Sequence, residues 1–205
     1  MKPLLTRLSR FFIVLKRRWR TLKRSSLNLE QKLLTVNEWS RPGTKLHKLR
    51  GIVLHWVENP MTDIEHNWEF FESRKNGTKG YGSAHFIIGI DGKVLQCIPL
   101  DEVAYHAGPT EATTKIAKSY LSNWPNGCTL GIEFCHMDWT GEYTKKTWDA
   151  GVKLCAQLCN QFGLSECDLY THDFITKKGC PRWFVNHPDE FVRFEDDVAG
   201  ELLYG

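Results

Sequence analysis

Two short apolar runs constrain the fold of this chain more than any other feature. They are GIVLHWV at residues 51–57 and TLGIEFC at residues 129–135. Runs of this length, rich in β-branched and aromatic residues, are typical of strands buried inside a sheet, whereas a core helix needs a longer periodic segment. Both segments are therefore predicted to be central strands.

Three helices are predicted around these strands. Thr62 and Glu65 have the spacing of a capping box, which predicts a helix that ends near residues 76–77. Residues 144–162 carry apolar side chains at helical spacing, and Gly163 supplies the stop. A last helix is predicted over residues 189–203.

The remaining strands complete one mixed sheet. Two apolar runs, 84–90 and 93–98, flank Asp91-Gly92, a pair that favours a tight hairpin turn. Residues 168–171 have the character of a short strand. Because strands and helices intermingle along the chain, we predict an α/β (α+β) domain with a central mixed β-sheet flanked by helices.

The length of 205 residues suits one domain with a substantial core. We expect residues 1–48 to be a basic N-terminal segment and extended lead-in, and residues 49–205 to be the folded domain. The first 25 residues carry no acid and the following basic residues: Lys2, Arg7, Arg10, Lys16, Arg17, Arg18, Arg20, Lys23 and Arg24.

Charge and hydropathy limit the partners. The net charge is only +3, so the part outside the basic segment is mildly acidic, which argues against nucleic-acid binding. The longest apolar stretch near the N-terminus, residues 11–15, is too short for a signal peptide or a membrane span. We expect synthesis in the cytoplasm, a monomer, and at most weak membrane or wall contact through the basic segment.

The seven cysteines do not suggest a disulfide framework. Their number is odd and no signal peptide is recognisable, so most are expected to be reduced side chains in the core. Cys180 differs, because it follows His172 and Lys178 in the polar stretch THDFITKKGCP.

Three separate segments carry polar residues that could bind a metal or take part in a reaction. His55 lies in the first central strand, and His172 and Cys180 lie in the stretch just described. Two imidazoles and a thiolate would give a catalytic Zn²⁺ three protein ligands and leave one position for water. Either histidine alone is more often a core or edge residue than a ligand; the combination indicates a metal site.

Two charged residues could complete a hydrolytic site. Glu133 stands near the end of the second central strand, where it could act as a general base or be a surface carboxylate. Lys178 could stabilise an oxyanion if it turns inward beside Cys180, or it could be a solvated charge.

The ordered set GIVLHWV, SAHFIIGIDGKVLQCIPLDEVAYHAG, LGIEF and THDFITKKGCP resembles N-acetylmuramoyl-L-alanine amidases of type 2. That class includes bacteriophage lysozyme-type and wall-lytic amidases and the peptidoglycan recognition proteins. The resemblance covers about residues 49–185. It implies a peptidoglycan recognition protein-like fold, Zn²⁺ held by His55, His172 and Cys180, and hydrolysis of the amide between N-acetylmuramic acid and L-alanine.

The resemblance also assigns the other site residues. Some members carry a catalytic tyrosine before the His-Phe pair, where this chain has Ala84. Other members use a glutamate at the position of Glu133, so Glu133 is the expected base. Lys178 matches the family lysine. His106 resembles a residue on the substrate side, or is a turn histidine before Ala107-Gly108, and His85 is a further substrate-binding candidate. Trp56 is a candidate for another reason: it follows His55 directly, and its aromatic face could pack on a sugar ring. The partner would be bacterial peptidoglycan, or muropeptides in the cytosol.

Two alternative functions stay open on the sequence. A cysteine peptidase would use Cys180 as nucleophile and His172 as base, but that scheme leaves His55 without a task. A non-catalytic peptidoglycan-binding module would not require Glu133, Lys178 and the third metal ligand. A phage lysin, a host autolysin and a recycling enzyme share the same chemistry and cannot be separated by these residues.

Overall fold

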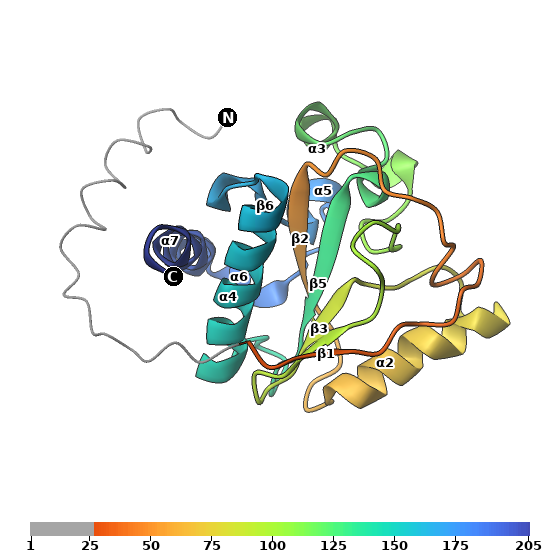
Figure 1. Ribbon diagram of the computed structural model, residues 1–205, viewed down its shortest axis with the longest axis horizontal. Coiled ribbons are helices and arrows are strands. Elements are labelled where there is room, and N and C mark those ends of the chain that lie inside the picture. Colours follow the sequence, from red (N-terminus) through yellow and green to blue (C-terminus); the bar gives the residue numbers. More distant parts are fainter. Residues whose placement is uncertain (1–26) are drawn as a thin grey trace.

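The computed structural model describes residues 27–205, and the predicted α/β class is confirmed. A mixed sheet lies between two layers of helices (Figure 1). The elements are β1 (Leu29–Gln31), β2 (Gly51–Trp56), α2 (Ile64–Ser73), β3 (Phe86–Ile88), β4 (Val94–Gln96), α3 (Lys115–Tyr120), β5 (Thr129–Phe134), α4 (Lys145–Phe162), β6 (Leu169–Thr171), α5 (His172–Thr176), α6 (Arg182–Asn186) and α7 (Pro188–Tyr204).

The sheet has the strand order β1-β4-β3-β5-β2-β6. The two predicted central strands, β2 and β5, pair in parallel along their whole length. Strand β3 runs parallel to β5 and antiparallel to β4, which makes the sheet mixed. The hairpin predicted at Asp91-Gly92 joins β3 and β4, and Gly92 takes the positive φ of 84° that the turn requires.

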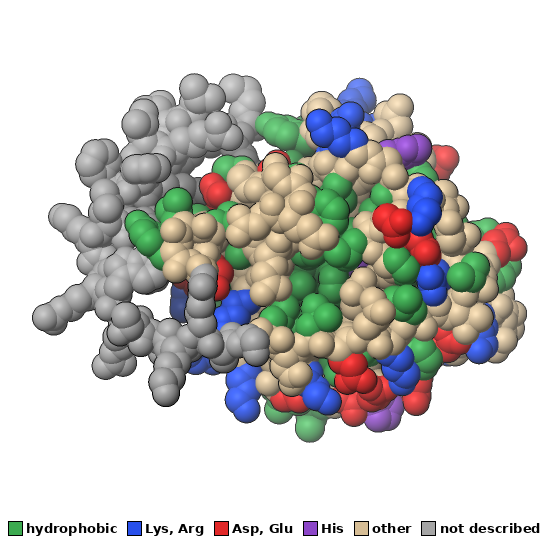
Figure 2. Space-filling view, viewed as in Figure 1, with side chains coloured by type: hydrophobic (Ala, Val, Ile, Leu, Met, Phe, Trp, Pro, Cys, Tyr) green, Lys and Arg blue, Asp and Glu red, His purple; other side chains and the backbone are tan. Residues whose placement is uncertain are grey.

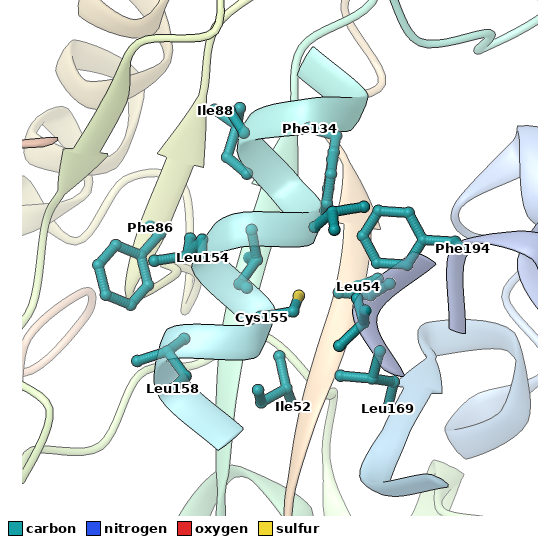
Figure 3. Close-up of a cluster of buried hydrophobic side chains, with 14 of the residues drawn as sticks. Ile52, Leu54, Phe86, Ile88, Phe134, Leu154, Cys155, Leu158, Leu169 and Phe194 are labelled. Atoms are coloured by element: carbon teal, nitrogen blue, oxygen red, sulfur yellow. The ribbon is translucent and has the colours of Figure 1, made fainter. Parts of the chain in front are cut away.

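One face of the sheet packs against α4, and α7 packs against α4 in turn. Figure 3 shows Ile52 and Leu54 of β2, Phe86 of β3 and Phe134 of β5 around α4, with Phe194 of α7 closing the cluster. All five side chains are buried. Successive side chains of a strand point to opposite faces of the sheet, so every second residue of each strand contributes to this apolar face. The face supplies most of the core.

The opposite face is covered only in part. Helix α2 packs over β3 through Ile64 and Phe71. Helices α3 and α5 cover the other end, where Val53 and Tyr170 join their cluster. The functional residues described below lie on this face of the sheet.

One local prediction needs correction. Helix α2 is capped by Asp63, whose carboxylate accepts the His66 backbone N–H at 2.9 Å. Thr62, the predicted cap, donates its hydroxyl to the Asn59 carbonyl instead. A carboxylate binds the positive end of a helix more strongly than a hydroxyl does, so the aspartate one position later takes the cap.

Part of the lead-in packs against the folded domain. Strand β1 pairs in parallel with β4, and Leu34 is buried against Ile64 and Leu95. The division of the chain at residues 48 and 49 stays a prediction. The basic run, which ends at Arg24, lies outside the described residues.

Helix apolarity and surface charge bear on which partners the described residues could contact. Within residues 27–205, no helix combines the length and apolarity needed to cross a bilayer. On the face drawn in Figure 2, basic and acidic side chains alternate along the lower edge.

Gly151, in the middle of α4, gives a test of the core packing. A Cβ at this position would lie 2.5 Å from Phe134 Cε1, so Gly151→Ala should destabilise the protein by about 1–3 kcal/mol although alanine favours helices. Gly200→Ala in α7 is the control, because nothing lies within 4 Å of its Cβ position. That change should stabilise the protein by up to about 1 kcal/mol. Urea unfolding measures both; equal effects would contradict this packing.

Candidate active site

The pairing of β2 with β5 brings His55 and Glu133 together. They are register partners in the parallel ladder, so their side chains leave the sheet on the same face and at the same end. The neighbours Leu54 and Phe134 point to the opposite face and into the core. The apolar strands therefore anchor two polar side chains that are far apart in sequence.

His172 and Cys180 arrive from the strand on the other side of β2. Thr171, the last residue of β6, caps α5 through its hydroxyl, so His172 opens a five-residue helix. The sequence suggested a loop from His172 to Cys180, but α5 fills more than half of it. The Asp173 backbone N–H then donates to the Cys180 carbonyl at 2.8 Å, and its carboxylate accepts the Gly179 N–H.

The predicted metal ligands form one buried cluster. The donor atoms of His55, His172 and Cys180 all lie within 4.8 Å of one another. His55 Nδ1 is 3.1 Å from His172 Nδ1 and 3.8 Å from Cys180 Sγ. Two ligands of one tetrahedral Zn²⁺, with bonds of about 2.0–2.3 Å, are roughly 3.3–3.6 Å apart. The donor set and its spacing thus fit Zn²⁺.

A hydrogen-bond chain fixes which nitrogen of His55 faces this cluster. His106 Nε2 lies 3.3 Å from the Thr129 carbonyl oxygen, which can only accept. His106 Nδ1 must then accept from His55 Nε2, 3.1 Å away. The proton on Nε2 leaves the lone pair of His55 Nδ1 directed toward His172 and Cys180, which is the state that a metal ligand needs.

His106 thus orients the lone pair of His55, and its predicted contact with substrate stays a prediction. It lines the cleft but is largely buried, and burial keeps its pKa well below the usual value, with a further lowering from neighbouring His85. The Asn126 side-chain oxygen accepts the backbone N–H groups of His106 and Ala107, which holds the ring in place.

His85, another predicted substrate contact, does not line the cleft. The side chain is fully buried, its Nε2 donates to the Glu102 carbonyl at 2.9 Å, and its Nδ1 accepts from the Gly131 N–H at 3.0 Å. Burial lowers its pKa to about 4. With both nitrogens satisfied inside the protein, His85 supports β5 beneath the site.

Trp56 contributes mainly through its backbone. Only 5% of it is exposed, and its ring stacks on His136 with centroids 4.6 Å apart. Its backbone N–H hydrogen-bonds Cys180 and favours the thiolate, against a pKa that burial raises. The predicted role as an aromatic wall for substrate therefore has little exposed ring surface to support it.

Glu133 is held in an environment suited to proton transfer. Burial raises the pKa of its carboxyl to about 8, and the Lys178 ammonium opposes that shift. Its Oε2 is buried and has no hydrogen-bond partner among the described residues. Lys178 itself is about half exposed and lies 3.6 Å from the Glu58 carboxylate.

These side chains line one cleft of about 860 Å³. Its floor is the sheet face at the ends of β2 and β5, and its walls come from α2 on one side and residues 105–112 on the other. The cleft contains His55, Glu133, His172, Lys178 and Cys180. A general base candidate and three metal-ligand candidates thus share one accessible space.

A profile of the N-acetylmuramoyl-L-alanine amidase family matches residues 45–183. The chain belongs to this family. BlyA, an N-acetylmuramoyl-L-alanine amidase of Bacillus subtilis (strain 168), is 30% identical over 175 residues, which are 82% of this chain and 46% of BlyA. A probable N-acetylmuramoyl-L-alanine amidase of Bacillus licheniformis is 32% identical over 167 residues, again 82% of this chain and 46% of the relative. The chain therefore spans about half the length of these relatives.

Solved structures show the same fold. A mutant endolysin from Bacillus subtilis has a TM-score of 0.62 at 22% identity, over 86% of this chain and 99% of the endolysin. PlyL has a TM-score of 0.66 at 17% identity, over 86% of this chain and 99% of PlyL. At this level of identity the likeness establishes the amidase fold and no more.

Several supporting residues of this amidase-family site were missed in the sequence. Thr129 and Asn126 orient His106, and Asp173 closes the turn before Cys180. Only Thr171-His172-Asp173 carried a recognisable pattern, since a threonine followed two residues later by an acid is typical of a helix start. Thr129 acts through its backbone carbonyl, which no side-chain pattern reveals.

Gly131 tests the packing that orients the amidase-family histidines. A Cβ there would lie 2.5 Å from His106 Cγ, so Gly131→Ala should cost about 1–3 kcal/mol of stability. His106→Ala opens that space, so the double variant should lose clearly less than the sum of the single losses. Urea unfolding of the four proteins gives the coupling energy; strictly additive losses would refute the contact.

Proposed function

We propose that this protein is a zinc-dependent hydrolase that cleaves the amide bond between N-acetylmuramic acid and L-alanine in bacterial peptidoglycan. The observation that carries the proposal is the joint presence of His55, His172, Cys180 and Glu133 in one cleft. Family membership and the amidase names of the relatives support the substrate and the bond cleaved.

His55, His172 and Cys180 would hold the zinc. A bound Zn²⁺ at this place supplies Lewis-acid polarisation of the scissile carbonyl and a water of lowered pKa. The chain prepares the site for that charge. The lone pair of His55 is directed by His106, and the Trp56 N–H and the Lys178 ammonium both favour the thiolate of Cys180.

Glu133 would carry the proton through the reaction. Its carboxylate accepts a proton from the attacking water as the new C–O bond forms. The same proton then passes to the nitrogen of L-alanine as the C–N bond breaks, so the amine leaves neutral. Lys178, at the rim of the cleft, would stabilise the negative charge that develops on the carbonyl oxygen.

The cysteine peptidase is less consistent with the structure. The thiol of Cys180 is only 3% exposed, and burial raises its pKa, whereas a nucleophilic cysteine needs an accessible thiolate. A binding module would have no use for Glu133 and Lys178 beside the three donors in the cleft. Both alternatives therefore leave features of the cleft without a role.

The proposed substrate indicates where the protein acts. We propose action on the cell wall, or on muropeptides in the cytosol, by a monomer. The basic N-terminal segment could add weak contact with anionic wall polymer or lipid.

Removal of the third ligand tests the metal site. Cys180→Ala should lower zinc affinity by more than about a hundredfold, because the thiolate is the only anionic ligand. The purified protein should contain one zinc per chain by elemental analysis. Cys155→Ala is the control, since Cys155 is also buried but lies in the α4 core. Full zinc content in Cys180→Ala would exclude this ligand set.

Neutralising the base tests the mechanism. Glu133→Gln should keep its zinc and lose about 10²–10⁴-fold in turnover, because the amide cannot accept the water proton. The assay counts newly released L-alanine amino termini from purified peptidoglycan. Glu142→Gln, an exposed glutamate outside this cleft, should retain wild-type turnover. Wild-type rates for Glu133→Gln would remove Glu133 from the reaction.

A further inference from the structure

An exposed aromatic side chain stands in the cleft away from the metal-ligand cluster. Tyr81 is 56% exposed and lines the cleft with Tyr105. The ring faces a concave surface, and exposed apolar groups gathered in a groove commonly mark a ligand-binding site. The reaction outlined above gives Tyr81 no task.

The ring is held from three directions. Trp39, in the lead-in, packs on it with centroids 4.7 Å apart, and Tyr105 meets it edge-on at 5.2 Å. The Tyr81 hydroxyl donates to the Glu38 carboxylate at 3.0 Å. Arg74 donates to the carbonyl oxygens of Gly80 and Tyr81, which fixes the backbone on which the ring stands.

The lead-in that supplies Trp39 is itself anchored. The Asn37 side-chain oxygen accepts the backbone N–H groups of Trp39 and Ser40, each at 2.8 Å. Arg41 forms a two-pronged pair with Glu102 at 2.8 and 3.1 Å, and both side chains are largely buried. The Tyr81 platform is therefore ordered before any ligand arrives, which lowers the entropic cost of binding.

We propose that Tyr81, backed by Trp39 and Tyr105, is a stacking subsite for an N-acetylated amino sugar of the glycan strand. This inference rests on the proposed function and adds a glycan contact to it. Trp39 and Glu38 precede the residues matched by the family profile, 45–183, so the part of the platform that backs Tyr81 comes from this chain's own lead-in.

The chemistry of the platform favours a sugar over the peptide part of peptidoglycan. A flat aromatic face packs well on the apolar C–H face of a pyranose ring. The exposed Glu38 carboxylate beside it accepts hydrogen bonds from hydroxyl or acetamido N–H groups and repels carboxylates, which the stem peptide carries. The guanidinium of Arg74, which also lines the cleft, donates through Nη1 to backbone carbonyls of residues 79–81.

The size of the cleft allows such a contact together with the reacting amide. At about 860 Å³ it lies near the upper end of the range for ligand pockets. The aromatic contact should therefore strengthen binding of long glycan strands and leave the reacting atoms unaffected. We expect the subsite to lower KM for polymeric peptidoglycan without a change in kcat.

The test compares variants of the full chain by their affinity for peptide-free glycan strands, measured by titration calorimetry. Tyr81→Ala should weaken binding about tenfold, the loss expected for one aromatic stacking contact. Tyr81→Phe keeps the ring and should stay within about threefold of wild type. Tyr120→Ala is the control, because Tyr120 is 52% exposed but lies outside the cleft.

Each outcome decides the proposal. Unchanged glycan affinity in Tyr81→Ala overturns it, as does an equal loss in Tyr120→Ala. A loss of affinity for free stem peptide, with glycan binding intact, would make the platform a peptide site and also overturns it. Glycan binding that depends on Tyr81, in a protein that frees no L-alanine amino termini from peptidoglycan, would support the subsite and refute the amidase proposal, so the two failures are distinguishable.

Discussion

The parallel pairing of β2 with β5 is the interaction on which the rest of this structure depends. Its register sets His55 beside Glu133, and the next strand, β6, delivers His172 to the same edge of the sheet. A shift of one residue would turn His55 into the α4 core and bring apolar side chains to the cleft. The hydrophobic burial of one sheet face thus fixes the position of the polar groups on the other.

The two faces of the sheet have different roles: one forms the core and the other carries the cleft. The face under α4 and α7 is continuous apolar packing, with contacts close enough that Gly151 has no room for a methyl group. The other face is covered at its ends by α2 and by α3 with α5, and the cleft lies where that cover stops. A rigid core behind the site allows a short hydrogen-bond chain to hold each side chain in one orientation.

That chain begins at a backbone carbonyl. The Thr129 carbonyl oxygen can only accept a hydrogen bond, so the tautomer of His106 follows, and with it the tautomer of His55. Burial lowers the pKa of both imidazoles, which keeps them neutral. Neutral imidazoles with defined lone pairs are what a metal site requires, and here the protein fold supplies them before a ligand is present.

The central strands, the hairpin at Asp91-Gly92, helix α4 and the three metal-ligand candidates could all be predicted from the order of residues alone. Those features depend on local periodicity, on turn residues and on the chemistry of individual side chains, all of which can be recognised in the sequence. The cap of α2 was misplaced by one residue because two adjacent polar residues could each serve.

The contacts of the other histidines and of the lead-in became known only from the folded structure. His85 is buried beneath β5, His106 hydrogen-bonds His55, and Trp56 offers Cys180 its backbone N–H. The substrate contacts expected of these residues stay predictions. Trp39 reaches the cleft through Tyr81, 42 residues later in the chain. Such roles depend on contacts between distant segments and on backbone atoms, and neither is encoded in the spacing of residue types.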